Sequence, residues 1–570
     1  MSTDILKRVK GYFEEAVQAP AYRTWLADAK KAWAFYDGEQ WTADEVQKLE
    51  EYGQAPIVIN KIAPKVDNVA GTEIASRTRI IYRSRSGEAG EEETAKALSD
   101  LALYVAERSE QAIELSNMFK AGLITGVAWL DVGIEDGEEG AVVFNRYENE
   151  MQVVWDSAAT RQDYSDARFV CRERWLDEEE VKRLFPETAD SLLSTTSAEE
   201  RTRFGARPLG EDVIYFNSDR KLWRVIEVQY KQTEKLYRVR TVTGEPVLTF
   251  DKAEARQINA EDTLDVTYAP RVHVAYYSGN VLLGHEPLPY LHNRFTLIPY
   301  LFKRDRKTGA PYGLVRTAID PQRELNKRRS KAMHLLNTAQ VIADVDAVDD
   351  PDMLAREAAR PDGMILKRPG KDLRIIRNTD LAASQVSVME KAALDIQEVM
   401  GVFDEAIGRH TNATSGVAIQ TRQMASNTNQ MFAFDALRRT KKMLGLTVLA
   451  LIRQYFTNEM TIQITDNLSA PRLVRLNQPL RDEQGNTMLR DDGKPVILND
   501  VRTGIFDIHV EEVTDALSSR ELELSQLQLL MQAGVPVPPQ MLVEASTLRN
   551  KEQLIRELDG QAQPSASKPL

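Results

Sequence analysis

Residues 416–456, GVAIQTRQMASNTNQMFAFDALRRTKKMLGLTVLALIRQYF, decide how the rest of this chain is organised. Apolar positions recur at helical spacing, because Val417 and Met424 stand seven residues apart, as do Leu437, Leu444 and Leu451. The pattern predicts one continuous helix of about 60 Å at about 1.5 Å per residue. Such a rod is longer than a small domain is wide.

The segments just before this helix are as informative as the helix itself. The polar run 409–415, RHTNATS, follows a second apolar and acidic helical pattern that ends at Gly408. A helix, a polar loop and a very long helix fit a large assembly better than a compact enzyme.

Composition excludes several classes of protein. The 570 residues carry 42% hydrophobic side chains and a net charge of -13, so we expect folded domains that do not hold nucleic acid by tight phosphate neutralisation. The single cysteine, Cys171, rules out a disulfide framework and favours a reducing compartment. The N-terminus lacks a signal-peptide pattern, and no long uncharged apolar stretch is present, so we expect no membrane segment.

Helical and strand patterns alternate along the first 311 residues. Residues 3–36, 61–74 and 92–123 read as helices, and 127–301 read as short strands and hairpins such as VAWLDVGI and WRVIEVQYKQ. The fold class is therefore predicted to be α+β.

A small module interrupts the second half. We expect a helix from Asp320, as N-cap, and Pro321 to about residue 337, then strands around VIADV, GMILKRP and LRIIRN in 338–380, then a helix over 381–407. Strand patterns return at 461–514, where the sheet is expected to close. Helices follow from a capping box at Ser518 and Glu521, and the final residues read as disordered.

Motifs for common enzyme chemistry are missing. The sequence holds no GxxxxGK[ST], GxGxxG, HExxH or GxSxG pattern, and we expect no catalytic residues, no cofactor and no metal. The six histidines lie apart in sequence and are expected to be structural: His273, His285, His292, His334, His410 and His509. The acidic run Asp344 to Asp352 lacks the glycine and terminal glutamate of a calcium loop, which favours a solvated loop over a metal site.

Acidic and basic residues gather in different parts of the second half of the chain. The helix at 381–407 is acidic, through Glu390, Asp395, Glu398, Asp404 and Glu405. This pattern is typical of a solvated face, or of a negatively charged pore if the chain repeats around a ring. Basic residues gather in 303–307, 323–331 and 367–377, which leaves a solvated face and a partner or nucleic-acid surface equally open.

Several segments together resemble the portal (head-to-tail connector) proteins of short-tailed bacteriophages. They are YDGEQW at 36–41, APIVINKIAPKVDNVAGTEIASR at 55–77, and the stretches 153–187, 292–333, 414–445 and 499–534. The likeness covers roughly residues 30–540 and rests on the joint pattern rather than on one motif.

The resemblance implies a portal fold with an α+β wing, a helical stem, a small α/β clip, a long helix behind a tunnel loop and a short helical crown. The parts would be 1–311 and 461–515 for the wing, 312–337 and 381–407 for the stem, 338–380 for the clip, 408–416 for the tunnel loop, 417–460 for the long wing helix, 516–558 for the crown and 559–570 for a disordered tail.

The resemblance also implies a function. It predicts a ring, expected to have twelve subunits, at one capsid vertex of the virion, assembled in the host cytoplasm. Double-stranded DNA would pass through the channel during packaging and ejection. Expected partners are the terminase large subunit, a tail adaptor or head completion protein, and the major capsid and scaffolding proteins, with no membrane.

Site residues follow from the implied parts. The acidic stem residues named above would line the channel. Residues of the tunnel loop would face DNA, and basic residues of the clip would contact terminase and adaptor. These two sets are Arg409, His410, Asn412 and Thr414 in the loop, and Lys367, Arg368, Lys371 and Arg374 in the clip.

Two alternatives stay open. One is a metal-dependent nuclease that uses the Asp344 to Asp352 cluster. The other is a helical adaptor built on a coiled coil at 416–456, which the strand content elsewhere disfavours.

Overall fold

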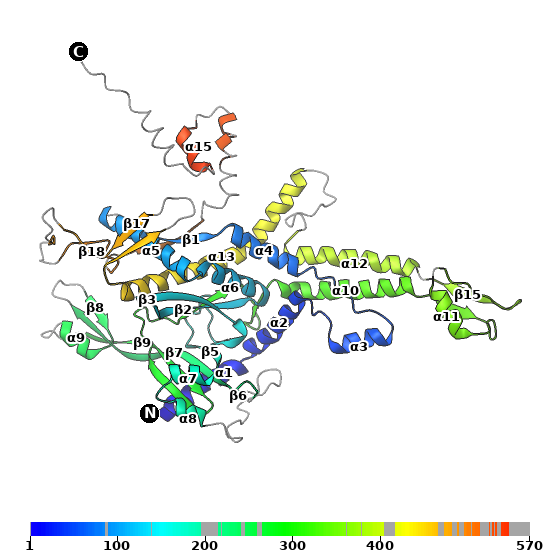
Figure 1. Cartoon of the computed structure of the whole chain (residues 1–570), viewed down its shortest axis with the longest axis horizontal. Coiled ribbons are helices and arrows are strands. Elements are labelled where there is room, and N and C mark those ends of the chain that lie inside the picture. The colour runs from blue at the N-terminus through cyan, green and yellow to red at the C-terminus, as the bar shows by residue number, and fades with distance from the viewer. Residues whose placement is uncertain are drawn as a thin grey trace, which may run out of the picture.

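The computed structural model shows a broad body from which a long helical hairpin projects (Figure 1). It describes residues 2–85, 89–137, 140–194, 215–217, 219–240, 246–258, 265–360, 362–377, 379–403, 416–464, 472–481, 487–489, 495–502, 504, 506–512, 524, 527–528, 530–532 and 537–546. The fold mixes helices and strands, so the predicted α+β class is confirmed.

Among the described residues up to Thr125, six helices are present: α1 (Ser2–Gln18), α2 (Pro20–Asp37), α3 (Ala43–Glu51), α4 (Ala63–Ala75), α5 (Ala89–Arg108) and α6 (Gln111–Thr125). The helical regions predicted over 3–36 and 92–123 are confirmed, and each is divided into two helices. Pro20 starts α2 afresh because proline has no N–H to continue the preceding helix. Glu110, with a φ of 50°, separates α5 from α6.

Two sheets form the centre of the body. The larger has seven strands: β4 (Val153–Trp155), β5 (Phe169–Leu176), β6 (Phe216–Asn217), β7 (Leu222–Arg240), β8 (Pro246–Thr249), β9 (Asp265–Ser278) and β10 (Val281–Pro287). The smaller has β2 (Val127–Gly137) between β3 (Gly140–Glu148) and β11 (Leu297–Leu301). All pairings are antiparallel, as alternating strand patterns predict.

A buried ion cluster joins the two sheets. Arg172 of β5 reaches Asp131 of β2, Glu148 of β3 and Glu227 of β7, and the exposed fraction of each of these four residues is 9% or less. Arg174 of β5 adds a second guanidinium to the cluster, at 2.8 Å from Glu148. A buried carboxylate needs such a partner, because a buried charge without one is costly.

The late strands do not close the large sheet, and that prediction is wrong. β20 (Phe506–Glu512) pairs with β1 (Thr78–Ser84), whereas β16 (Met460–Ile464) pairs with β17 (Arg472–Leu476) and β18 (Gln478–Pro479) with β19 (Ile497–Leu498). An alternating pattern predicts that a segment is an extended strand, but it does not specify which other strand pairs with it. Two short pairs are β12 (Lys303–Arg304) with β13 (Pro311–Tyr312) and, in the projecting part, β14 (Gln340–Ala343) with β15 (Leu373–Ile376).

The long helices follow the predicted order with shifted ends. α10 (Val315–Asn337) starts before the expected N-cap Asp320 and carries Pro321 inside it, because Val315 and Ala318 are buried in the core and tertiary packing outweighs the local signal. α12 (Thr379–Met400) stops before residue 407, since Gly401 adopts a φ of 66°.

The predicted helix over 416–456 is confirmed as α13 (Gly416–Tyr455), the longest helix of the chain's described part. Its second half lies in the main core, where Leu437, Leu444 and Leu451 are all buried. In the insert, the expected strand GMILKRP is not a strand, and α11 (Pro351–Ala359) was not foreseen. Short helices complete the description: α7 (Glu178–Leu184), α8 (Ala189–Leu193), α9 (Lys252–Ile258) and α15 (Pro539–Ala545).

Several sequence predictions lie outside the described residues: the capping box at Ser518 and Glu521, most of 516–558, and the tail 559–570.

Candidate functional site: a helical hairpin and its anchors

The hairpin of α10 and α12 projects from the body and ends in the insert 338–377 (Figure 1). The two helices lie side by side along their length and run in opposite directions, since α10 leaves the body and α12 returns to it. Ala392, Ile396 and Met400 of α12 are buried against the core. The hairpin is therefore an extension of the body and does not have a separate core.

The exposed side of α12 is acidic. Glu390, Asp395 and Glu398 are exposed, and within the described part of the chain none of the three has an ion-pair partner. They share this side with one exposed lysine, Lys391, and with Leu394, whose exposed fraction is 56%. The two other acidic residues predicted here, Asp404 and Glu405, lie outside the described residues.

The chain itself covers the opposite side of the hairpin. The segment that contains α3 packs on α10, where Glu45 lies 2.6 Å from the Arg323 Nη2 atom and 3.1 Å from the Lys327 Nζ atom. Partial burial of Glu45 opposes ionisation, but the Thr42 N–H and these two cations lower its pKa to about 2. Part of the basic run 323–331 is thus used inside the chain.

Two of the four basic residues predicted as partner contacts in the insert are already paired. Arg368 bonds the Asp349 carboxylate, which raises the pKa of the guanidinium, and the Arg374 Nε atom lies 2.9 Å from Asp372. Lys367 donates from Nζ to the carbonyl of Lys371 at 3.2 Å, and the Lys371 side chain is exposed. All four remain at the surface of the insert.

The insert also exposes much apolar surface. The exposed fractions are 83% for Val345, 74% for Met364 and 81% for Leu366. Three such side chains on one small module exceed what a solvated loop needs.

Carboxylates of the acidic run Asp344 to Asp352 form hydrogen bonds to backbone N–H groups within the insert. Asp350 caps α11 by accepting the N–H groups of Asp352 and Met353, and Asp344 accepts the N–H of Asp372 at 2.7 Å. In the described part of the chain, no three His, Cys, Asp or Glu side chains are grouped so that they could hold a metal ion.

The base of the hairpin is tied to the body by a buried lysine. Lys65 of α4, with an exposed fraction of 2%, donates from Nζ to the carbonyl oxygen of Val402 at 2.6 Å. Val402 lies two residues after Met400, the last residue of α12, and is itself buried, so this cation pairs a buried carbonyl just beyond the helix. Residues 404–415, which include Arg409, His410, Asn412 and Thr414, lie outside the described residues.

A second buried lysine fixes α13. Lys441 contacts Glu73 of α4 at 3.4 Å and the Thr78 Oγ1 atom at 2.9 Å, and Ser116 of α6 donates to the same Glu73 carboxylate. Burial lowers the pKa of Lys441, whereas Glu73 acts in the opposite direction. α4 therefore anchors both α12 and α13.

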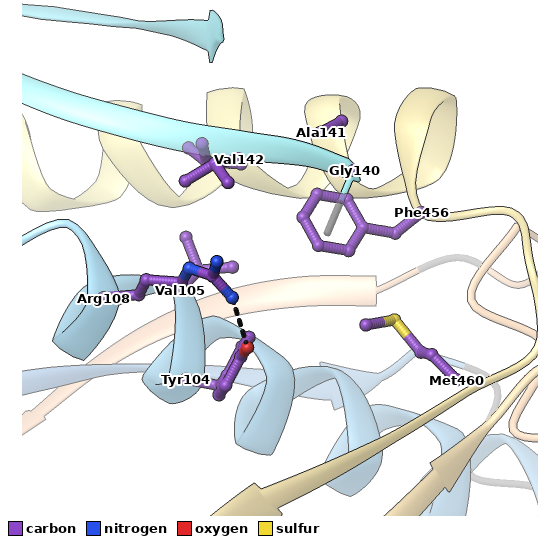
Figure 2. A pocket seen from close by; sticks show the side chains of 9 residues that line it. Tyr104, Val105, Arg108, Gly140, Ala141, Val142, Phe456 and Met460 are labelled. Carbon is purple, nitrogen blue, oxygen red and sulfur yellow. Dashed lines mark hydrogen bonds between the residues drawn. The ribbon is translucent and has the colours of Figure 1, made fainter. Parts of the chain in front are cut away.

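One small hollow lies on the body, away from the hairpin (Figure 2). It has a volume of about 80 Å³ and is lined by apolar side chains such as Val142, Phe456 and Met460, with Arg108 donating to Tyr104 at its edge. That volume holds a few water molecules and is far below the size of a nucleotide site.

Sequence reasoning missed the anchoring residues. Lys65 reads as an ordinary surface lysine in a helix. Gln322, Asn326 and Ser330 read as the polar side of α10, but all three are buried and accept N–H groups of the segment 57–61. Their common spacing of four residues is the signal that could have identified the latter three as one stripe.

No helix of the described residues is long and apolar enough to span a membrane. The comparisons with known proteins agree with the earlier resemblance. Residues 10–569 match the family described as "Phage P22-like portal protein". The portal protein of Helicobacter pylori bacteriophage KHP30 is 22% identical over 463 residues, which are 79% of this chain and 66% of that protein. The chain thus spans slightly less than two thirds of the length of this curated relative.

Proposed function

Because this chain belongs to the phage P22-like portal protein family, we propose that it forms a ring of twelve subunits at one capsid vertex, through which double-stranded DNA enters and leaves. Portal proteins are a structural family and not an enzyme family. The proposal places the protein in the virion, after assembly in the host cytoplasm.

One observation carries the proposal: the exposed side of α12 is acidic. The segment around α3 lies against α10, and α12, on the other side of the hairpin, exposes Glu390, Asp395 and Glu398. If the exposed α12 faces of all copies turn toward a common axis, the channel is negatively charged. A negative wall repels phosphates, and DNA can then slide without being held.

The remaining sequence predictions become parts of the same proposal. The insert is the clip, whose exposed Val345, Met364 and Leu366 and whose basic groups would contact the terminase large subunit and then a tail adaptor or head completion protein. The body would contact major capsid and scaffolding proteins. Arg409, His410, Asn412 and Thr414 stay predictions for a DNA-facing loop.

Electron microscopy of the purified protein tests the ring directly. We expect class averages of a closed ring with a central channel. Particles that remain monomeric at high protein concentration would contradict the proposal.

A charge-neutral variant tests the channel assignment. We expect Glu390→Gln, Asp395→Asn and Glu398→Gln together to leave rings intact but to increase retention of linear DNA at low salt, since wall repulsion falls. The matched control is Glu179→Gln, Glu187→Gln and Asp190→Asn, three exposed carboxylates on the body. Equal DNA retention by the two variants would show that the three α12 carboxylates do not line the channel.

A further inference from the structure

A hydrogen-bonded ladder joins an extended segment to one stripe of α10. The N–H groups of Ile57, Ile59 and Lys61 donate to the Ser330 Oγ, Asn326 Oδ1 and Gln322 Oε1 atoms at 3.1, 3.1 and 3.0 Å. Alternate residues of the extended chain thus meet every fourth residue of the helix.

The two repeats match in length. Four helical residues rise about 6 Å, and two extended residues span about 6.6 Å. The three hydrogen bonds can therefore form in succession without strain, in the way that successive hydrogen bonds form between two paired strands. Gln322 and Asn326 extend the ladder, because Gln322 also donates to the carbonyl of Ile59 and Asn326 donates to Gln40.

The rungs are buried but polar. The exposed fractions of Gln322, Asn326 and Ser330 are 0%, 1% and 1%. A polar stripe of this kind can be rehydrated when the covering segment leaves, whereas an apolar stripe would expose surface that water does not solvate well.

The Ile59 side chain packs against the main core, and the part of the segment around α3 is held by polar contacts. α3 has no buried residue, closes its own N-terminus with a capping box between Thr42 and Glu45, and reaches α10 through the Glu45 ion pairs with Arg323 and Lys327. Such partly exposed ion pairs contribute little stability and weaken with salt.

We infer that residues 42–61 form a strap that docks on α10 and leaves it as one cooperative unit, and that docking holds the hairpin against the body. The continuation of the strap through Ile62 into α4 reaches Lys65, which bonds the carbonyl of Val402 just after α12. The strap and α4 thus contact α10 and the residues that follow α12. The inference rests on the proposed function only in treating the hairpin as the stem of a channel.

Amide hydrogen exchange resolved to single residues tests cooperative release. Asn326→Leu removes the acceptor of the Ile59 N–H, together with the contacts of Asn326 to Gln40 and Gln322, but leaves the acceptors of the Ile57 and Lys61 N–H groups in place. We expect exchange at Ile57 and Lys61 to accelerate about tenfold together with Ile59, which corresponds to the loss of about one hydrogen bond. Ser330→Ala is a milder second variant and should accelerate Ile59 and Lys61. Lys331→Ala, at an exposed position of α10, is the control and should change none of the three.

Two outcomes would overturn the inference. Acceleration confined to the N–H whose acceptor was removed would show independent contacts. Exchange of all three amides only together with the amides inside α10 would show that the strap never leaves alone.

A cross-link supplies the converse experiment. Glu45→Cys with Lys327→Cys, joined by a short bismaleimide, should slow exchange at the three amides at least tenfold, while Cys171 is fully buried and should not react. Unchanged exchange after cross-linking would contradict a releasable strap. Because exchange can be measured on single chains, the absence of rings in electron micrographs would refute the proposed function and leave the strap intact.

Discussion

The Nζ atom of Lys65 lies 2.6 Å from the carbonyl oxygen of Val402, so a buried cation of α4 binds the chain two residues beyond the end of α12. The two residues are 337 positions apart in the chain. This contact places the end of the hairpin on the body.

Replacing Lys65 should loosen this end. We expect Lys65→Met to lower the free energy of unfolding by about 1–3 kcal/mol, because the Val402 carbonyl loses a charge-assisted hydrogen bond. Urea denaturation measures the effect, with Lys391→Met, an exposed lysine on α12, as the control. Equal stability of the two variants would mean that water replaces the lysine at no cost.

Removing Arg172, the central arginine of the buried ion cluster, should lower the free energy of unfolding more than the Lys65 substitution does. Arg172→Met removes the cation that Asp131, Glu148 and Glu227 share. Glu148 keeps the Arg174 guanidinium at 2.8 Å, but Asp131 and Glu227 lose their close cation, and we expect a loss of about 3–5 kcal/mol. The control is Arg183→Met at an exposed position of α7. Thermal unfolding followed by circular dichroism measures the difference, and a loss under about 1 kcal/mol would contradict the assignment of the cluster as the joint between the sheets.

Substitution of two helical glycines by alanine should change the free energy of unfolding in opposite directions. A Cβ atom at Gly122 of α6 would lie 2.1 Å from the Tyr300 Cδ1 atom, so Gly122→Ala should destabilise the protein by about 1–3 kcal/mol. At Gly71 of α4 a Cβ atom would have no neighbour within 4 Å. Gly71→Ala should therefore stabilise by about 0.5–1 kcal/mol. Denaturation midpoints check both, and an unchanged or higher midpoint for Gly122→Ala would refute the packing of Tyr300 on α6.

Acid should destabilise the fold through His292. Burial, with a smaller contribution from Arg294, lowers the pKa of His292 to about 4, below the value of about 6.5 in an unfolded chain. The unfolded state therefore takes up the proton first, and stability falls as the pH drops from about 6.5 toward 4. Burial lowers the pKa of His273 and His285 as well, so they act in the same direction.

Urea denaturation between pH 7 and pH 5 tests the histidine. His292→Asn should reduce the slope of stability against pH, since an Asn side chain can still accept the N–H of Arg294 that His292 Nδ1 accepts at 3.0 Å. His509→Asn, at an exposed position, should leave the slope unchanged. A slope unaffected by His292→Asn would assign the acid sensitivity to other groups.

The sequence predicted helices correctly where a periodic apolar pattern continues over many residues. It did not predict helix ends or contacts that depend on packing against distant parts of the chain. Forty residues of uninterrupted helical pattern predicted α13, whereas α10 starts at Val315 because burial outweighs the cap signal at Asp320. The acidic face of α12 was visible at Glu390 and Glu398, since exposed charges follow helical spacing. The covering of α10 was not visible, because it depends on a segment more than 260 residues away.

The sequence by itself determined the α+β class, the order of the long helices around the insert and the charge of α12, since each depends on local periodicity and composition. Only the tertiary structure decided that β20 pairs with β1, that Arg172 joins two sheets, and that Lys65 and the strap hold the hairpin. The reason is physical: a backbone N–H, a carbonyl or a buried charge needs a partner, but its own sequence does not specify which distant group will provide it.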